Sequence, residues 1–223
     1  MSTTGDTNIL QKEQIKDAAG LEEELKNMLN ISTPSDILSI FFNTQGQRAA
    51  IYTKWNQGFR VYLDTQNEEE YTKLCQTVSS LISKVSKELI MIEAALQPIK
   101  PKWSTIINEL RDYEKVKFIL TSKYQILKTE VHANDSMTRI DEDGNIIKME
   151  NDGCFKEHIQ GCNQQLQECQ TTLNQITSMI NEKLEDLQYE LNEEEDAKGT
   201  PDRSNKDTHN NEHKHEHSHT CNH

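Results

Sequence analysis

The end of the sequence concentrates side chains that bind transition metals. Six of the eight histidines lie beyond Asp196, and imidazole binds zinc, nickel and copper. The metal-binding residue types alternate with other positions, and they are His213, His215, His217, His219, Cys221 and His223. Because alternate residues of an extended chain project to one side, the tract predicts metal binding in solution. The alternative interpretation is a biased, solvated terminus with no metal in the cell, since nothing around the tract would fix a tetrahedral site.

A second group of possible metal ligands is spaced for one stripe of a helix. Cys154, His158 and Cys162 follow one another at intervals of four residues, and two ligands one helical turn apart can chelate a metal. Cys162 also continues an apolar seam that includes Cys169, and free cysteine is a common small residue of protein cores. Core packing is therefore the favoured interpretation. The five cysteines lack the spacing of a disulfide framework, which suits a reducing compartment.

Two cations interrupt otherwise apolar helical seams. Arg48 and Lys117 either form a buried polar layer or partner contact, or they lay their methylene groups on the core and extend their charges into solvent. The second interpretation is favoured for both residues. The large aromatic residues of the same region have helical spacing and are assigned to the core, and they are Trp55, Phe59, Tyr62 and Trp103.

The sequence lacks the spacings that are typical of catalytic centres. It contains no glycine-rich phosphate loop and no His-Glu-x-x-His pair. Outside the tail, only His132 and His158 would act as bases near neutral pH. We expect a protein that is not an enzyme and that needs no cofactor, apart from metal bound by the tail.

The composition indicates long helices. Only 34% of the 223 residues are hydrophobic, and eight glycines and four prolines are too few for a sheet protein with many turns. No apolar run approaches the roughly 20 residues that span a bilayer, and the first residues do not resemble a signal peptide. We therefore expect an intracellular protein that makes no contact with a membrane.

Apolar residues recur every third or fourth position along four segments, which predicts an all-α, elongated antiparallel bundle or coiled coil. Thr33-Pro34-Ser35-Asp36 is typical of a helix start, and short connections favour antiparallel neighbours. The predicted organisation is a weakly helical polar segment (1–33), a three-helix core (34–131), an acidic loop or small hairpin (132–153), a long acidic coiled-coil helix (154–195) and a disordered tail (196–223).

The long helix is predicted to extend beyond the three-helix core. At 1.5 Å per residue it would measure roughly 60 Å, so the end of its apolar stripe would lack a partner within the chain. That end consists of Ile180, Leu184, Leu187 and Leu191. We expect a helix of another protein to complete the stripe, or a second copy of the chain to form a homodimer.

The charge is concentrated in one region of the chain. Of the formal net charge of −13, residues 132–195 contribute −11, whereas residues 36–131 carry +2. Because phosphate binding depends on lysine and arginine, direct binding of nucleic acid is expected to be absent or weak. The best candidates for such a contact are Lys84, Lys87, Lys100 and Lys102.

Residues of the three-helix core follow the pattern of a known family. They are Gln47, Arg48, Ala49, Tyr52, Gly58, Phe59, Tyr62, Leu63, Tyr71, Ser86, Glu88, Ile92, Glu93, Leu110, Tyr113, Glu114, Lys115, Lys117, Thr121 and Gln125. Over about residues 35 to 131 the chain resembles the B-type "required for excision" domain, a helical family named for a link to excision repair of DNA. The resemblance implies a nuclear or general intracellular role in repair and gives no catalytic residue.

Taken with the helical seams, the resemblance predicts a non-catalytic accessory factor that binds other proteins in DNA repair. The alternative is a coiled-coil structural or assembly protein unconnected with DNA. The resemblance lends weight to Arg48, Tyr52 and Gly58, and to the group of Glu114, Lys115 and Lys117.

Overall fold

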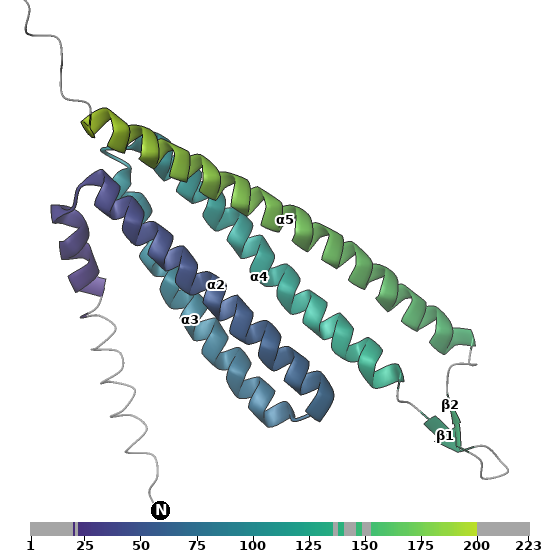
Figure 1. The fold of residues 1–223 in the computed structure, drawn as a ribbon. Helices are drawn as coiled ribbons and strands as arrows, with labels where there is room; N and C mark the ends of the chain where they lie inside the picture. The colour runs from purple at the N-terminus through teal and green to yellow at the C-terminus, as the bar shows by residue number, and fades with distance from the viewer. Residues whose placement is uncertain (1–19, 21, 136–137, 141–145, 149–152, 200–223) are drawn as a thin grey trace, which may run out of the picture.

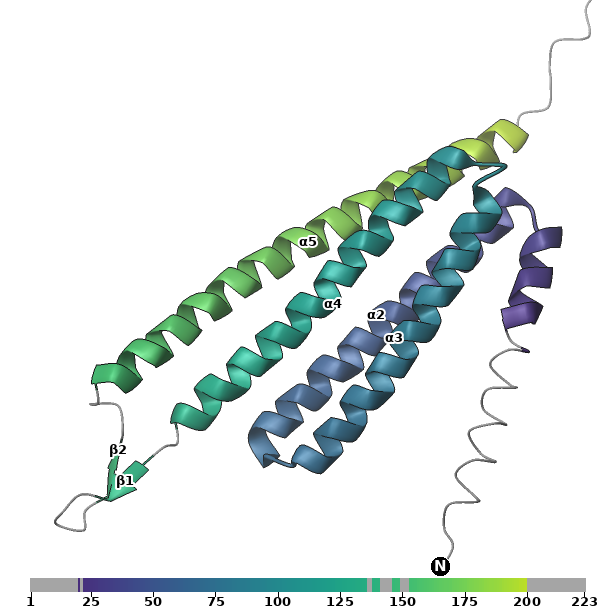
Figure 2. The ribbon, with the colours of Figure 1, turned by 180° about the vertical axis from the view of Figure 1, so that it is seen from behind.

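The protein folds as two long helical hairpins that lie side by side (Figure 1). The computed structural model describes residues 20, 22–135, 138–140, 146–148 and 153–199. Its main elements are α2 (Pro34–Thr65), α3 (Glu68–Leu96), α4 (Pro101–Asp135), β1 (Thr138–Ile140), β2 (Ile146–Lys148) and α5 (Gly153–Gly199). A further helical segment, 22–31, precedes α2. The all-α fold is confirmed, and Figure 2 shows the same arrangement of the hairpins from behind.

Local signals in the sequence set where α2 begins and ends. Thr33 accepts a hydrogen bond from the backbone N–H of Asp36 (3.2 Å), and the Asp36 carboxylate accepts one from the backbone N–H of Thr33 (3.1 Å). This capping box satisfies two of the free donors of the first turn. At the other end Gln66 adopts a left-handed φ of 54°, and Asn67 then caps α3. The α2–α3 connection is therefore a tight turn.

The acidic connection between α4 and α5 contains a short hairpin. β1 and β2 pair antiparallel, with Arg139 opposite Ile147. This agrees with the hairpin alternative for residues 132–153. Most of the predicted N-terminal segment and of the tail, residues 1–19 and 200–223, lies outside the described part of the chain. Segment 22–31 is helical, and α5 extends to Gly199, so residues 196–199 are helical and not part of a disordered tail.

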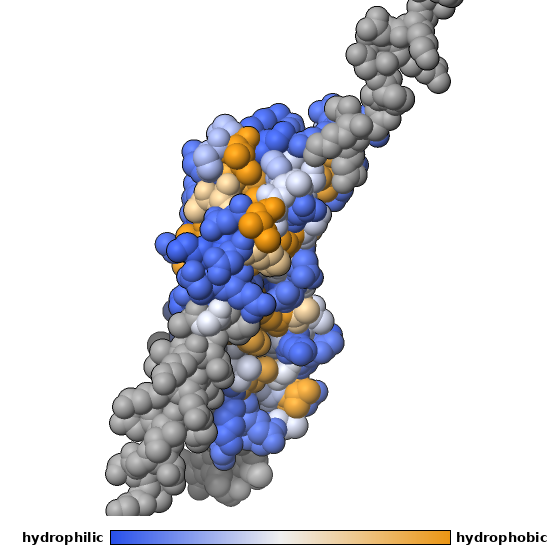
Figure 3. Space-filling model, turned by 90° about the vertical axis from the view of Figure 1, so that its left-hand side faces the viewer, coloured by the Kyte–Doolittle hydropathy of each residue, from blue (hydrophilic) through white to orange (hydrophobic). Residues whose placement is uncertain are grey.

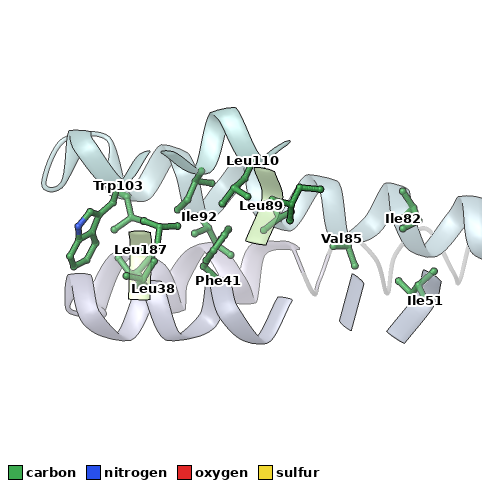
Figure 4. Packing of buried hydrophobic residues seen from close by; sticks show 14 of the residues in the cluster. Leu38, Phe41, Ile51, Ile82, Val85, Leu89, Ile92, Trp103, Leu110 and Leu187 are labelled. Atoms are coloured by element: carbon green, nitrogen blue, oxygen red, sulfur yellow. The ribbon is translucent and has the colours of Figure 1, made fainter. Parts of the chain in front are cut away.

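The hydrophobic core is built around the regular seam of α3. The seam residues Val78, Ile82, Val85, Leu89, Ile92 and Leu96 are all buried. Leu38 and Phe41 of α2 and Leu110 of α4 pack in the same cluster, which Figure 4 shows from close by. Gly58 lies on the α2 side of this packing, because a Cβ atom there would come within 2.0 Å of a methyl group of Leu74. The heptad pattern thus correctly identified the face that α3 buries.

The end of α5 is part of this core and is not an open stripe. Ile180, Leu187 and Leu191 are buried in the main cluster, and Leu184 is half-buried against it. The prediction that these residues await a partner helix is wrong. The long helix was predicted to extend beyond the core. Instead, α4 continues to Asp135, and after the β1–β2 connection α5 runs back along the whole length of α4.

Polar contacts hold the end of α5 against the start of α4. Glu190 accepts a hydrogen bond from the indole N–H of Trp103 (3.3 Å) and forms an ion pair with Lys102. Lys183 forms an ion pair with Glu109 at 2.8 Å. On the face in Figure 3, hydrophobic side chains form separate patches among hydrophilic ones. Within the described part of the chain, no helix is long and apolar enough to cross a membrane.

We predict that Leu187→Ala will destabilise the protein strongly. Leu187 is 0% exposed, and removal of a fully buried leucine side chain typically costs about 2–5 kcal/mol of unfolding free energy. Urea denaturation followed by circular dichroism measures the change. Tyr189→Ala, two residues away and 64% exposed, is the control and should have a much smaller effect. Equal losses for the two variants would contradict the burial of α5 described above.

Candidate binding groove beside a buried ion pair

A buried ion pair joins the two helical hairpins. Nε of Arg48 on α2 lies 2.9 Å from a carboxylate oxygen of Glu114 on α4, and the two side chains are 4% and 5% exposed. Arg48 lies on the apolar seam of α2, and Glu114 is likewise buried on α4, in an interior where an isolated charge would carry a large desolvation cost. Each charge therefore requires the other, and the contact holds α2 in register with α4.

Two further side chains complete this polar layer. Arg48 donates to the hydroxyl of Ser86 on α3 (3.3 Å), and Ser86 donates to the backbone oxygen of Ile82 (2.7 Å). The hydroxyl of Tyr52 lies 3.5 Å from the backbone oxygen of Glu114. Burial, and next the negative charge of Glu114, hold the pKa of Tyr52 well above its usual value. The layer thus contains one neutralised ion pair and a phenol that stays protonated.

A second polar layer links the same three helices further along α4. The phenol of Tyr71 on α3 donates to the side-chain oxygen of Gln125 on α4 (2.5 Å). The Gln125 amide in turn donates to Asn56 on α2 (3.4 Å). Gln125 is 3% exposed, so these hydrogen bonds satisfy an amide that water barely reaches. The two layers hold α2, α3 and α4 together, and they leave one side of α2 free to face α5.

A groove of about 630 Å³ lies on that side, between α2, α4 and α5. Aromatic rings from α2 and α4 line part of it, and they are Tyr52, Phe59 and Tyr124. The side chains of α5 that face it are uncharged, and they are Gln170, Leu173, Asn174 and Thr177. This volume lies within the range of pockets that hold small ligands or a few side chains.

The charged side chains that line the groove are all cations. Arg60 comes from α2, and Lys117 and Lys128 come from α4. Among the described residues that line the groove there is no aspartate and no glutamate. The groove is therefore locally positive in a chain whose net charge is −13, and it favours an anionic ligand.

Lys117 connects the groove to the buried layer. Its ammonium group lies 4.8 Å from the centre of the Tyr52 ring, which is a cation–π contact. Lys117 is half-buried, so its stem rests on the core while its charge reaches the groove. This agrees with the favoured interpretation of Lys117. For Arg48 that interpretation is wrong, because Glu114 provides the internal partner that keeps the guanidinium buried.

The structure separates the predicted partner-binding residues into two places. Lys117 lines the groove and Arg48 lies in the buried polar layer beside Tyr52, whereas the stripe 180–191 lies in the core. The tail residues His213, His215, His217, His219, Cys221 and His223 lie outside the described residues. The side chain of Cys154 is also outside them, while Cys162 is buried in a small cluster with Leu127, Val131 and Leu166.

Sequence reasoning did not predict the groove, although it named several of the residues that line it, such as Tyr52, Phe59 and Lys117. Asn56, Arg60 and Lys128 were not singled out, although a signal for them existed. On α2, positions 49, 53, 56, 60 and 63 recur every third or fourth residue beside the apolar seam and therefore share one face. The sequence alone does not show that this face meets an uncharged stretch of α5.

A family model described as DNA repair REX1-B matches residues 36–128. This match confirms the resemblance seen in the sequence and links the chain to DNA repair. The matched segment contains α3, nearly all of α2 and most of α4, and therefore both polar layers, but it excludes α5. No curated protein and no solved structure matches the chain significantly.

We predict that Arg48→Met will destabilise the protein by about 3–5 kcal/mol, because it leaves the Glu114 charge buried without a partner. The double variant Arg48→Met/Glu114→Met should recover much of that loss, since no buried charge remains. Chemical denaturation of the single and double variants measures both effects. The exposed ion pair of Lys73 with Glu69 is the control, and Lys73→Met should change stability little. Additive losses in the Arg48/Glu114 double variant would argue against the coupling.

We also predict that stability falls as the pH rises above about 10, the ordinary pKa of tyrosine. Burial is the main cause that raises the pKa of both Tyr52 and Tyr71 in the folded protein. Above pH 10 the unfolded chain loses these protons and the folded chain keeps them, so alkali favours unfolding. Unfolding free energies measured across this range should show a shallower decline in Tyr52→Phe/Tyr71→Phe. An identical slope in the variant would contradict the role of these two phenols.

Proposed function

We propose that this chain, whose residues 36–128 match the DNA repair REX1-B family model, is a non-catalytic accessory factor of DNA repair in the nucleus. Its work would be to bind another protein through the groove between α2, α4 and α5. The partner segment would be acidic and would carry at least one apolar or aromatic side chain. The observation that carries this proposal is the lining of the groove, which in the described part of the chain consists of three cations, three aromatic rings and uncharged residues, without a carboxylate.

The chemistry of the lining supports such a segment as the ligand. Carboxylates would pair with Arg60, Lys117 and Lys128, because charge-assisted hydrogen bonds are among the stronger polar contacts. An apolar side chain would rest on Tyr52 and Phe59. The amide and hydroxyl groups of α5 would hydrogen-bond to the backbone of the segment without repelling its charge.

A short acidic segment fits the surroundings better than a nucleic-acid strand does. A strand carries a charge at every phosphate and would extend past the ends of the groove. Beyond the uncharged stretch of α5 it would meet Glu182, Glu185 and Asp186. Such carboxylates would repel a continuous polyanion, whereas a short peptide would end before it reaches them.

The alternative of a self-associating coiled coil has lost its main support. That interpretation relied on an open apolar stripe at residues 180–191, and the structure buries this stripe within the chain. The REX1-B match also links the chain to DNA repair. We therefore favour the accessory factor over the assembly protein.

Charge reversal in the groove should abolish binding of an acidic peptide. The probe is a fluorescent peptide of glutamate and aspartate with interspersed phenylalanine and leucine, followed by fluorescence anisotropy. We expect Arg60→Glu/Lys128→Glu to weaken binding by at least about tenfold, since each lost charged contact contributes roughly that factor. The control is Lys54→Glu/Lys123→Glu, which makes the same charge change on the same two helices but at exposed residues outside the groove.

Equal binding by the groove variant and the control would overturn the peptide proposal. Tighter binding of single-stranded DNA of the same length, with the same loss in the groove variant, would assign the groove to nucleic acid instead.

For the cellular role, cells that lack the protein should be sensitive to ultraviolet light. Wild type and the Lys54/Lys123 variant should restore survival, and the groove variant should not.

A further inference from the structure

We propose that Glu130, His158 and Cys162 form a zinc site that joins α4 to α5, distinct from the groove and from the histidine tail. Glu130 comes from α4, and His158 and Cys162 are one turn apart on α5. One ligand atom from each of the three residues lies within 4.8 Å of the other two. The proposal does not depend on the peptide-binding function.

The distances between the ligand atoms are close to those of a tetrahedral zinc site. With Zn–S of about 2.3 Å and Zn–N of about 2.0–2.1 Å, a thiolate and an imidazole on one zinc ion lie about 3.5 Å apart. The Cys162 Sγ and His158 Nε2 atoms are 3.7 Å apart. Both atoms can therefore contact one ion with little movement of α5.

The carboxylate requires a modest adjustment. Glu130 Oε1 lies 2.7 Å from His158 Nε2, whereas two such ligands of one zinc ion lie about 3.3 Å apart. The Glu130 and His158 side chains are 41% and 55% exposed, so the surrounding packing leaves them room to separate. A metal between these two atoms would replace their direct hydrogen bond.

The environment of Cys162 suits a cation next to its sulfur. The residue is 5% exposed, and burial together with the charge of Glu130 raises the pKa of its thiol. A divalent ion would offset the negative charge on both Glu130 and the thiolate. On binding, the sulfur–metal bond would form and the thiol proton would pass to solvent.

The chemical class of the ion follows from the ligands. One thiolate, one imidazole and one carboxylate suit zinc or cobalt better than magnesium or calcium, which prefer oxygen ligands. Three protein ligands leave one position of a tetrahedron for water. The site would fasten the two helices next to the α4–α5 connection, far from the core at the other end of the bundle.

Cobalt absorption spectroscopy of the full chain tests the site. A thiolate-to-cobalt charge-transfer band reports a sulfur ligand specifically, and histidines of the tail do not produce it. All proteins carry Cys221→Ser, which removes the tail thiol. We expect the band in this parent protein and in the control Cys75→Ser, a free cysteine on α3, and we expect its loss in Cys162→Ser.

Two variants at exposed positions keep the test decisive if Cys162→Ser does not fold. Glu130→Gln and His158→Gln should weaken cobalt and zinc binding by more than the roughly 10–100-fold that changes of second-shell partners cause. Zinc should also raise the melting temperature of the parent protein more than that of either variant. Absence of the band in the parent, its persistence in Cys162→Ser, or unchanged affinity in Glu130→Gln would overturn the site.

Discussion

The arrangement of the two helical hairpins depends on the ion pair between Arg48 and Glu114. Both charges lie in an interior that water barely reaches, so neither is tolerated without the other. A pair of apolar residues could slide past one another, whereas a hydrogen-bonded pair of charges permits only one register. Ser86 adds a contact from α3 to the same layer. The main contribution of the ion pair is therefore to geometry, because its Coulombic attraction is largely offset by the cost of removing both charges from water.

This constraint also shapes the groove. Glu114 forms an ion pair with Arg48 inside the bundle. Tyr52 belongs to the same polar layer, and its ring contacts the ammonium group of Lys117. Arg48 and Glu114 therefore neutralise each other beneath the groove, and the charges that face a ligand are those of the groove cations. The α5 residues that line the groove add no opposing charge, because they are all uncharged. Between Ile159 and Asn181 the helix carries one charged residue, Glu168, and this residue does not line the groove. Most of the acidity of the long helix lies in its last part, from Glu182 to Asp196.

Much of the fold could be predicted from periodicity, because a helix reveals its buried face through spacing alone. The seam of α3 and the capping box before α2 illustrate this. The end of α5 could not be placed, because spacing does not state which helix a stripe will meet or how far a neighbouring helix extends. Arg48 shows the same limit for a site: its place on a seam was evident, but the partner that makes burial possible lies on another helix. The groove also contains surface residues, namely Asn56, Arg60 and Lys128. Polar residues of this kind are common on any exposed helix face, so their types do not reveal which element they face.

The shared core of Leu38 and Leu187 has a consequence for folding of the chain during synthesis. Each hairpin consists of sequence neighbours, and such local contacts form rapidly. The cluster at the closed end of the bundle is different, because it joins the beginning of α2 to the end of α5 (Figure 4). As long as Leu187 is still inside the ribosome, the side chains of Leu38 and Trp103 in the emerged part of the chain are exposed to solvent. The protein therefore completes its core only after nearly all of α5 has left the ribosome, and until then this end of the bundle is the part most open to aggregation.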